Sequence, residues 1–426
     1  MNAKLIFNKE FTLQEPIPEA GIRRAVELMR SGRLHRYNTV PGEPSEVSLL
    51  EKEYAAFVGA RYCLGLSSCG SAIYVALKSA GVQPGDKVLC NAFTLAPVPG
   101  AIENAGAKPV FVEITEDYVT DLTDLETKAQ QSGARFFLLS HMRGHIVDML
   151  RAADICRRLN ITLIEDCAHT VGARWGEQFT GTFGLVGCYS TQTYKHMNSG
   201  EGGLLVTDDD DVMARAVLFS GSYMFYDRHL SRPARNVFEK HQKKIPNFSL
   251  RMSNLAAALI RPQLQNLDRQ CRRWNRRYAV IEAALNKVEP IYVPRRPSKE
   301  KFVGSSFQFT LKAVTPTAME TFLRTCAEKG LEIKWFGAAD PRGFTSSWES
   351  WQYIDHPQSL PRTRTILDGM CDFRIPLTFS IADCEIVANV IRQTAVEVLG
   401  DDCGGRRAEG GEQRTEVGCR KSGVGD

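Results

Sequence analysis

The sequence lacks the features that mark several large classes of protein. No apolar run approaches the roughly 18 residues that a membrane-spanning helix needs, and the N-terminal segment MNAKLIFNKEFTLQE has no apolar stretch of the secretory type. None of the 12 cysteines forms a C-x-x-C pair, which argues against zinc-ribbon and thioredoxin-like sites. We therefore expect a protein of the reducing cytoplasm, with no membrane partner and with buried thiols instead of disulfides.

The chain also lacks a large excess of charge of either sign. The chain has 53 Lys and Arg against 49 Asp and Glu, so its net charge of +4 is small for 426 residues. This balance gives no general reason to expect a nucleic-acid partner. The basic segment RQCRRWNRRY at 269–278 could be read as a nucleic-acid contact, but a solvated face of a helix explains it more simply.

The composition that is present is that of a globular protein. Hydrophobic residues make up 43% and charged residues 24%, which excludes a wholly disordered, collagen-like or coiled-coil chain. At about 150 residues per domain, the length predicts two or three domains.

The first half of the chain alternates between β-rich and helical segments. Amphipathic patterns that end at Gly32 and Gly59 predict two leading helices over 17–32 and 47–59. Helical segments lie between most of the β-rich runs that follow, which indicates an α/β fold with a mostly parallel sheet covered on both faces. The runs are CLGLSS, KVLCNAF, KPVFVEI, ARFFLLSH, ITLIEDC, GCYST and GGLLVTD.

The second half predicts a different organisation. A long amphipathic helix is expected over 255–288, bent at Pro262. Residues 290–395 contain a strand-like segment, SSFQFTL, and two helical segments, which is typical of a smaller α+β domain. We expect a large domain over 1–265, a small domain over 266–399 and a flexible tail over 400–426, where 8 of the 34 glycines gather.

The segment SSCGSAIYVAL at 67–77 is the first of three with chemical potential. A strand ends there in small residues and a helix begins at once. Free N–H groups near Gly70 and Ser71 would then form a phosphate cradle at the helix N-terminus. The alternative is an ordinary strand-to-helix turn capped by Ser71.

The segment LIEDCAHT at 163–170 is the second. A buried strand ends in Glu165 and Asp166, and His169 follows three residues later. A carboxylate at the end of a strand can orient a base or pair with a cationic ring. The alternative is a helix cap or a structural salt bridge.

A metal site is a further interpretation of Asp166 and His169. It would use Asp166 and His169 together with His141 and His145 of the segment HMRGH. Gly144 interrupts that segment and no cysteine is placed to complete the ligand shell, so we expect no metal.

The segment CYSTQTYKHMNSGEGGLLVTDD at 188–209 is the third. A strand delivers Ser190, and a short polar stretch carries Lys195. A lone lysine is usually a surface residue, but a phosphate cradle, a strand-end Asp and this lysine, in that order, describe a pyridoxal 5′-phosphate (PLP) site. The lysine amine forms a Schiff base with the cofactor's aldehyde, and the carboxylate keeps the cofactor's pyridine nitrogen protonated.

With these motifs the chain resembles the DegT/StrS-type sugar aminotransferases, a branch of the fold-type I PLP enzymes, over roughly residues 10–395. The resemblance implies a large domain with a seven-stranded sheet, a small C-terminal domain and a homodimer that shares its active sites. It rests on RSGRL, PGDKVLCNAFTLAPVPGAIENAGAKPVFVEI, IEDCAHTVGA, CYSTQTYKHMNSGEGGLLVTDD, SLRMSNLAAAL and RIPLTFSIADCEIVANVI.

The resemblance also implies roles for individual residues. Lys195 corresponds to the Schiff-base lysine, Asp166 to the partner of the pyridine nitrogen and His169 to the residue that lies against the ring. The phosphate contacts correspond to Gly70, Ser71 and Ser190.

Four departures from the family's pattern concern the cofactor and substrate. Leu95 stands where an aromatic often stacks on the ring, and Phe93 is expected to substitute. Ser249 replaces the Asn of the loop that reaches the partner's phosphate with Arg251, and nearby Asn247 is a second candidate. The segments HRYNTV and FSGS differ on the substrate side, which points to an unusual substrate.

The expected function is transfer of an amino group from an amino acid, Glu or Gln, to a keto-sugar or keto-cyclitol. Lys195 favours this chemistry, because dehydratases of the family carry His in its place. Two alternatives stay open: a dehydratase or other PLP enzyme acting on a non-sugar substrate, and a PLP-binding regulator without turnover.

Overall fold

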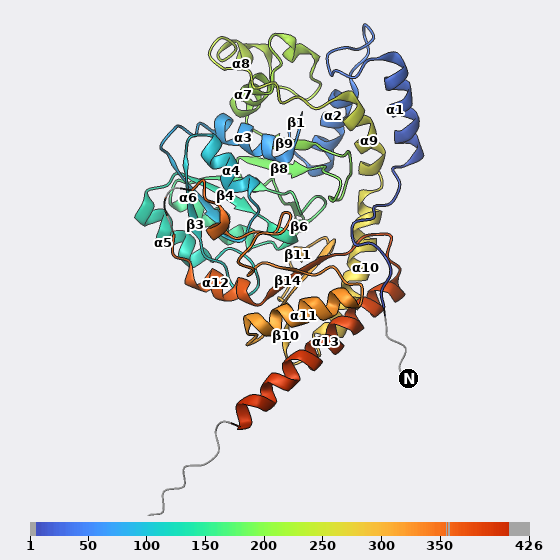
Figure 1. Cartoon of the computed structure of the whole chain (residues 1–426). Coiled ribbons are helices and arrows are strands. Elements are labelled where there is room, and N and C mark those ends of the chain that lie inside the picture. The colour runs from blue at the N-terminus through green and yellow to red at the C-terminus, as the bar shows by residue number, and fades with distance from the viewer. Residues whose placement is uncertain (1–5, 355, 357, 409–426) are drawn as a thin grey trace, which may run out of the picture.

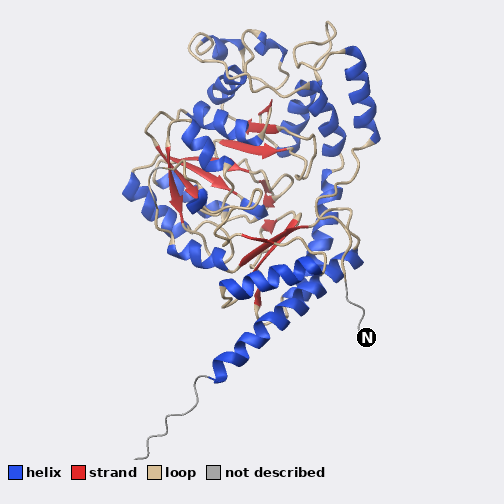
Figure 2. Cartoon of the chain, in the orientation of Figure 1, coloured by secondary structure: helices blue, strands red, loops and turns tan. Residues whose placement is uncertain are grey.

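The computed structural model describes residues 6–354, 356 and 358–408, and its centre is a seven-stranded sheet (Figures 1 and 2). The strand order is β1-β9-β8-β5-β4-β2-β3. Strand β9 runs antiparallel to both of its neighbours, and the other pairings are parallel. The strands are β1 (Tyr62–Leu66), β2 (Lys87–Asn91), β3 (Lys108–Val112), β4 (Phe136–Ser140), β5 (Thr162–Asp166), β8 (Val186–Ser190) and β9 (Gly203–Thr207).

Helices cover both faces of this sheet, as the β-α alternation predicted. One apolar core lies under α3, α4 and α7, and a second lies on the opposite face under α5 and α6. The short helices α4 and α5 were not recognised in the sequence. The helices are α3 (Cys69–Ala80), α4 (Pro97–Asn104), α5 (Leu122–Ser132), α6 (Met149–Arg158) and α7 (Asp210–Ser220).

The N-terminal helices α1 (Glu19–Ser31) and α2 (Glu46–Val58) pack beside α9 (Asn254–Leu264), as Figure 1 shows. Helix α1 approaches α9 closely at Gly21, where a Cβ atom would lie 3.1 Å from Pro262 Cγ and 3.3 Å from the Ala258 carbonyl oxygen. A larger residue at this position would therefore push the two helices apart.

The long helix expected over 255–288 is two helices in the structure, and the break falls at Gln265–Asn266, a few residues after the bend predicted at Pro262. Helix α9 continues through Pro262 to Leu264, and α10 (Leu267–Leu285) begins after a break. Asn266 Nδ2 donates to the Pro262 carbonyl oxygen at 3.0 Å, and its backbone N–H donates to Gln263. The asparagine side chain thus competes with the helical pattern and ends α9 there.

A smaller α+β unit lies below the large sheet in Figure 1. Its antiparallel sheet has the order β10-β12-β14-β13, and α10, α11 and α13 pack on it. Phe7 and Phe11 from the N-terminal segment also enter this core, beside Phe379 and Phe373. The elements are β10 (Ile291–Tyr292), β12 (Ser306–Leu311), α11 (Pro316–Glu328), β13 (Lys334–Trp335), β14 (Met370–Arg374) and α13 (Ile381–Ala408).

Short elements complete the described chain. Strands β6 (Arg174–Trp175), β7 (Gln178–Phe179) and β11 (Glu300–Lys301) form a three-stranded sheet between the two units. The remaining helices are η1 (Met142–Gly144), η2 (Phe225–Arg228), α8 (Arg235–Glu239), η3 (Trp348–Ser350) and α12 (Pro361–Asp368).

Helix α13 extends well beyond the body of the molecule (Figure 1) and reaches Ala408. The rest of the expected flexible tail, residues 409–426, lies outside the described residues, and the predicted domain boundaries stay predictions. The ten cysteines that the structure describes are free thiols, and most are buried. None of the described helices combines the length and the apolar character needed to cross a membrane.

Candidate active site

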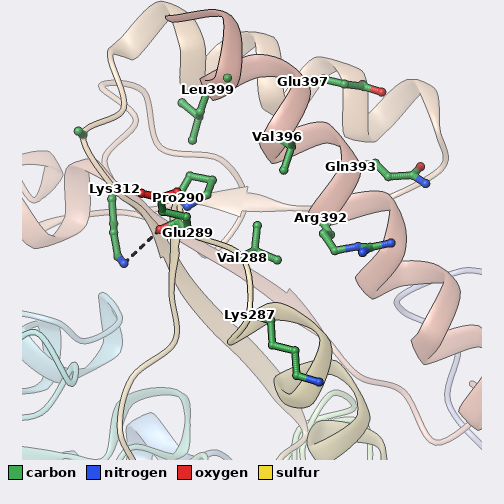
Figure 3. Close-up of a pocket in the computed structure, with 12 residues that line it drawn as sticks. Lys287, Val288, Glu289, Pro290, Lys312, Arg392, Gln393, Val396, Glu397 and Leu399 are labelled. Carbon is green, nitrogen blue, oxygen red and sulfur yellow. Dashed lines mark hydrogen bonds between the residues drawn. The ribbon is translucent and has the colours of Figure 1, made fainter. Parts of the chain in front are cut away.

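A large cavity lies beside α13 and holds none of the residues that the sequence singled out. Its volume is about 1000 Å³, and its walls come from the link between α10 and β10, from Lys312 and Ala313, and from α13. Figure 3 shows its charged side chains spread over the wall, with Lys312 and Glu289 on one side and Lys287, Arg392 and Glu397 elsewhere. Lys312 Nζ donates to the Glu289 carbonyl oxygen at 3.2 Å, which Figure 3 marks with a dashed line.

The second cavity, of about 270 Å³, lies at the carboxyl ends of the central strands. This is the edge at which open α/β sheets bind ligands. The structure brings five of the predicted site residues together in its wall. They are Gly70, Asp166, His169, Ser190 and Lys195.

Lys195 and His169 face each other in this cavity. Lys195 follows β8 in a tight turn, in which its N–H donates to the Gln192 carbonyl oxygen at 2.8 Å. Its Nζ atom lies 2.8 Å from His169 Nε2. Burial, together with the positive charge of Arg143, lowers the pKa of Lys195 to about 8. Burial and the charge of Lys195 hold the pKa of His169 well below its usual range, so the neutral ring accepts a hydrogen bond from the amine.

Asp166 ends β5, and its carboxylate is held from both sides. The Ser140 hydroxyl donates to Oδ2 at 2.8 Å, and the Ala168 N–H donates to Oδ1 at 3.1 Å. The Cys69 thiol also lies 3.8 Å from Oδ1. These contacts fix a carboxylate, only 5% exposed, in the cavity wall, where it can bind a cationic partner.

Glu165, the neighbouring acid, points to the opposite face of the sheet. Successive strand residues alternate between faces, so Glu165 is fully buried while Asp166 reaches the cavity. Its carboxylate accepts hydrogen bonds from the backbone N–H groups of Gly181, Phe183 and Gly184 at 2.7–2.9 Å. Glu165 is therefore a structural residue that holds the loop before β8.

The residues considered for a metal site do not come together. His145 Nε2 bonds to Gln308 Oε1 at 2.8 Å. Within the described part of the chain, the group close enough to share an ion is His141, Glu165 and Cys167, whose ligand atoms lie within 4.8 Å of one another. Since Glu165 already accepts three backbone hydrogen bonds and contacts His141 at 3.1 Å, its oxygens are committed to the protein.

The N-terminus of α3 lies at one end of the cavity. Ser68, and not Ser71 as one interpretation of the sequence had it, caps this helix, because its hydroxyl accepts from the Ser71 N–H at 3.0 Å. The Ser71 hydroxyl contacts those of Ser67 and Ser68 and does not line the cavity. Gly70 does line it, and the first N–H groups of a helix have no acceptor within the helix. This end of the cavity can therefore bind an anion.

A glycine in β9 brings that strand against the same turn. A Cβ atom at Gly203 would lie 2.2 Å from the Ser68 carbonyl oxygen and 2.7 Å from Cys69 N. Any side chain at Gly203 would thus displace the start of α3.

The structure does not bring Phe93 to the cavity. Phe93 is 1% exposed and packs edge-to-face on Phe336, with ring centroids 5.1 Å apart. Asn91 Nδ2 donates to the Phe93 carbonyl oxygen at 2.7 Å and fixes this turn after β2. Leu95, two residues later, lines the cavity instead. The expectation that Phe93 substitutes for Leu95 is therefore not supported.

Asn247, Ser249 and Arg251 do not line this chain's own cavity, although the loop runs beside the end of β1, where the Ser67 N–H donates to the Leu250 carbonyl oxygen at 2.9 Å. The Ser249 N–H donates to Asn247 Oδ1 at 2.8 Å, and Arg251 Nη1 donates to the Gly221 carbonyl oxygen at 2.7 Å. Ser249 adopts a left-handed φ of 55°. The segment is thus a folded loop beside the turn that leads into α3.

Two arginines of the cavity wall were missed in the sequence. Arg143 follows the end of β4 in the segment HMRGH, and its position after a strand was an available signal. Arg374 ends β14 in the small unit, and its guanidinium lies 3.9 Å from the centre of the Tyr194 ring. Only the packing of the two units brings Arg374 to this site.

Comparison with known proteins agrees with the fold and the site. The model of the DegT/DnrJ/EryC1/StrS aminotransferase family matches residues 19–391. The pleiotropic regulatory protein of Geobacillus stearothermophilus is 28% identical over 304 residues, 70% of this chain and 75% of that one. A putative L-glutamine:3-amino-2,3-dideoxy-scyllo-inosose aminotransferase of Micromonospora echinospora is 26% identical over 317 residues, 74% and 72% of the two chains.

A solved structure of 3-amino-5-hydroxybenzoic acid synthase has a TM-score of 0.78 at 22% identity, with 91% of this chain and 99% of that one covered. This likeness confirms the predicted fold. PLP is the cofactor of the matched family, so the predicted cofactor is confirmed as well.

Proposed function

The chain belongs to the DegT/DnrJ/EryC1/StrS aminotransferase family, and we propose that it transfers an amino group from Glu or Gln to the ketone of a sugar or cyclitol. It is a PLP-dependent aminotransferase; the substrates and the residue roles are the proposal. The observation that carries these roles is the convergence of Lys195, His169 and Asp166 in one cavity beside the N-terminus of α3.

The side chains of the cavity fit PLP. The N-terminus of α3 and the Ser190 hydroxyl suit its phosphate, Asp166 suits its pyridine nitrogen and Lys195 suits its aldehyde. When bound, PLP supplies the carbonyl carbon that takes up the amino group and a ring that withdraws electrons from the reacting carbon.

Lys195 would move the proton of the reaction at its Nζ atom. An amine with a pKa of about 8 is partly neutral near physiological pH, so it can both accept and return a proton. His169 accepts a hydrogen bond from Nζ and would orient the amine. Asp166, held by Ser140 and Ala168, would face the ring nitrogen.

Relatives support the substrate class without fixing the substrate. The names of two of them describe amino transfer to a cyclitol ketone and synthesis of an aminohydroxybenzoic acid. A direct test loads the protein with PLP, offers Glu, Gln and other amino acids, and then adds ring ketones with mass spectrometry of the product. Amination of a ring ketone that fails in Lys195→Ala would support the proposal, and release of a dehydrated product would favour the dehydratase alternative.

A regulator without turnover is the second candidate, because one relative bears the name of a pleiotropic regulatory protein. Such a protein would bind PLP at Lys195 but would not convert it with any amino donor. A donor screen that leaves the cofactor unchanged, with binding intact, would favour this candidate.

We further propose a homodimer in which the loop with Asn247, Ser249 and Arg251 completes the partner's phosphate site. This loop does not line its own cavity, and the buried Nδ2 atom of Asn247 has no hydrogen-bond partner among the residues that the structure describes. Mixing Lys195→Ala with Asn247→Ala should restore part of the activity through hybrid dimers. Hybrids that form without any recovery would argue against shared sites.

A further inference from the structure

The wall of the active-site cavity that comes from η1 and β14 carries an excess of positive charge. Three cations line the cavity, Lys195, Arg143 and Arg374, against two carboxylates, Asp166 and Glu201. Asp166 is assigned above to the cofactor ring, and Glu201 is an exposed residue. The two arginines are therefore not neutralised by acids that share the cavity with them.

The Arg374 side chain has no ion pair with any carboxylate that the structure describes, and its guanidinium lies over the face of the Tyr194 ring. Asp372 and Glu332 raise its pKa from a distance, but burial and the neighbouring charge of Arg143 outweigh them and lower it. A half-buried guanidinium in this situation gains from an anion more than a hydrated one does.

Arg143 is 7% exposed, and only part of its guanidinium is paired. Nη2 lies 2.8 Å from Asp372 Oδ2, whereas the buried Nε has no hydrogen-bond partner. Asp372 is itself fixed by Gln308, whose Nε2 donates to Oδ1 at 2.7 Å. Arg143 also adopts a left-handed φ of 54°, a costly conformation for a residue other than glycine. The fold thus holds a charged group rigidly in the cavity wall with donor capacity left over.

We propose that Arg143 and Arg374 form a carboxylate-binding subsite, and that the ketone acceptor is a ring ketone that bears a carboxylate. The proposal rests on the aminotransferase function above. Donor and acceptor occupy the same cavity in turn, so an acceptor without negative charge would bury the Arg374 guanidinium without an anion and leave the free donor of Arg143 unpaired. A planar carboxylate matches the donor geometry of a guanidinium. The apolar side chains of Leu95, Met142 and Phe344 in the same wall suit the carbon ring.

The first experiment measures binding to the pyridoxamine phosphate form, the form that meets the acceptor. Calorimetry compares cyclohexanecarboxylate with cyclohexanecarboxamide, which differ in charge and little in shape. We expect the carboxylate to bind about 10–100-fold more tightly, as charge-assisted hydrogen bonds predict. Arg374→Gln should bring the two affinities within about 3-fold of each other, and Arg374→Lys should keep part of the preference. Arg235→Gln, at an exposed pair with Glu239, is the control and should change nothing. Equal binding in the wild type, or a preference that survives Arg374→Gln, would overturn the subsite.

The second experiment separates the two possible sources of the carboxylate. The pyridoxamine phosphate form is mixed with 3-oxocyclohexanecarboxylate or its carboxamide, and the rate of cofactor conversion is followed. Faster reaction of the acid, lost in Arg374→Gln, supports a carboxylated acceptor. Equal rates for the two ketones, with a slower reaction of Glu in Arg374→Gln, would assign the arginines to the amino donor and overturn the acceptor claim. Failure of both Glu and Gln to convert the PLP form would instead contradict the proposed function, while the binding comparison still reports on the subsite.

Discussion

Lys195 Nζ and His169 Nε2 lie 2.8 Å apart, with the amine donating to a ring whose pKa is held well below its usual range. The cavity wall that holds this pair also carries the strand-end carboxylate of Asp166 and the guanidinium of Arg143. The opposing charges of these neighbours, together with burial, set the pKa of Lys195 at about 8.

The first prediction concerns the pH at which Lys195 becomes reactive. Only the neutral amine attacks an aldehyde, so the rate of PLP incorporation into the apoenzyme should rise with pH and level off above about 8. Arg143→Gln removes a positive charge that disfavours the protonated amine, so the midpoint should move to higher pH. Stopped-flow absorbance across about pH 6–10 measures both midpoints. An unchanged midpoint in Arg143→Gln, with Arg235→Gln as the control, would show that burial alone sets the pKa.

Asp166→Asn should slow amino transfer while leaving PLP bound at Lys195. The substitution keeps the shape of the side chain and removes the charge that the ring nitrogen needs. Loss of a buried charge pair costs about 3–5 kcal/mol, and a large share of this on the barrier would lower the rate by about 10²–10³-fold. Single-turnover kinetics with Glu measure the effect. Near-normal turnover would mean that the ring nitrogen is paired elsewhere, and Glu165 is not available for it because its carboxylate faces the other side of the sheet.

Glu165→Gln should have the opposite profile, with lower stability and little change in chemistry. The glutamate oxygens accept three backbone N–H groups, and a glutamine can present only one oxygen to them. We expect a loss of about 2–4 kcal/mol in the free energy of unfolding, measured by urea denaturation. The folded fraction should keep its PLP absorbance and its rate with Glu. A variant that is as stable as the wild type but inactive would place Glu165 in the chemistry.

Glu51→Gln should destabilise the N-terminal part of the large unit. Arg36 and Glu51 are fully buried and form a bidentate pair at 2.8 and 2.9 Å, and His229 lies 3.4 Å from the same carboxylate. Removing one charge of such a pair costs about 3–5 kcal/mol. Glu239→Gln, at the exposed pair with Arg235, should cost less than about 1 kcal/mol.

The same carboxylate gives the stability a pH dependence. Its pKa falls from 4.5 to about 2 in the folded protein; the opposing effect of burial is outweighed by the charges of Arg36 and His229. The contribution is therefore complete above pH 4.5 and is lost as the pH falls towards 2. Urea denaturation at several acidic pH values should show a shallower decline for Glu51→Gln than for the wild type. Parallel declines would show that other groups govern acid unfolding.

The sequence predicted the parts of the fold that follow from local patterns. All seven β-rich runs are strands of the central sheet, because each is a short buried run bounded by turn residues. Helix α4 escaped notice because its segment PVPGAIEN is short and contains two prolines and a glycine. The position of the break between α9 and α10 depends on a side-chain hydrogen bond of Asn266, and Pro262 gave a misleading signal.

Some residues of the active site could likewise be predicted from local sequence patterns, and others could not. Asp166 and Lys195 could be found because strand ends place their residues at one edge of a sheet. Phe93 and Leu95 lie two residues apart in the turn after β2. No sequence periodicity specifies which of the two side chains in such a turn faces the cavity. Arg374 reaches the cavity from the small unit, across about 180 residues of sequence from Lys195, and such long-range packing has no local signal.

The central claim is that Lys195 is the amine that binds the cofactor and moves the proton. Borohydride reduction of the PLP-loaded protein fixes the cofactor to the amine that holds it, and peptide mapping by mass spectrometry locates the label. We predict a label on the peptide that contains Lys195, and none on that peptide in Lys195→Ala. A label on any other lysine, or an unlabelled Lys195 in protein that holds PLP, would contradict the account.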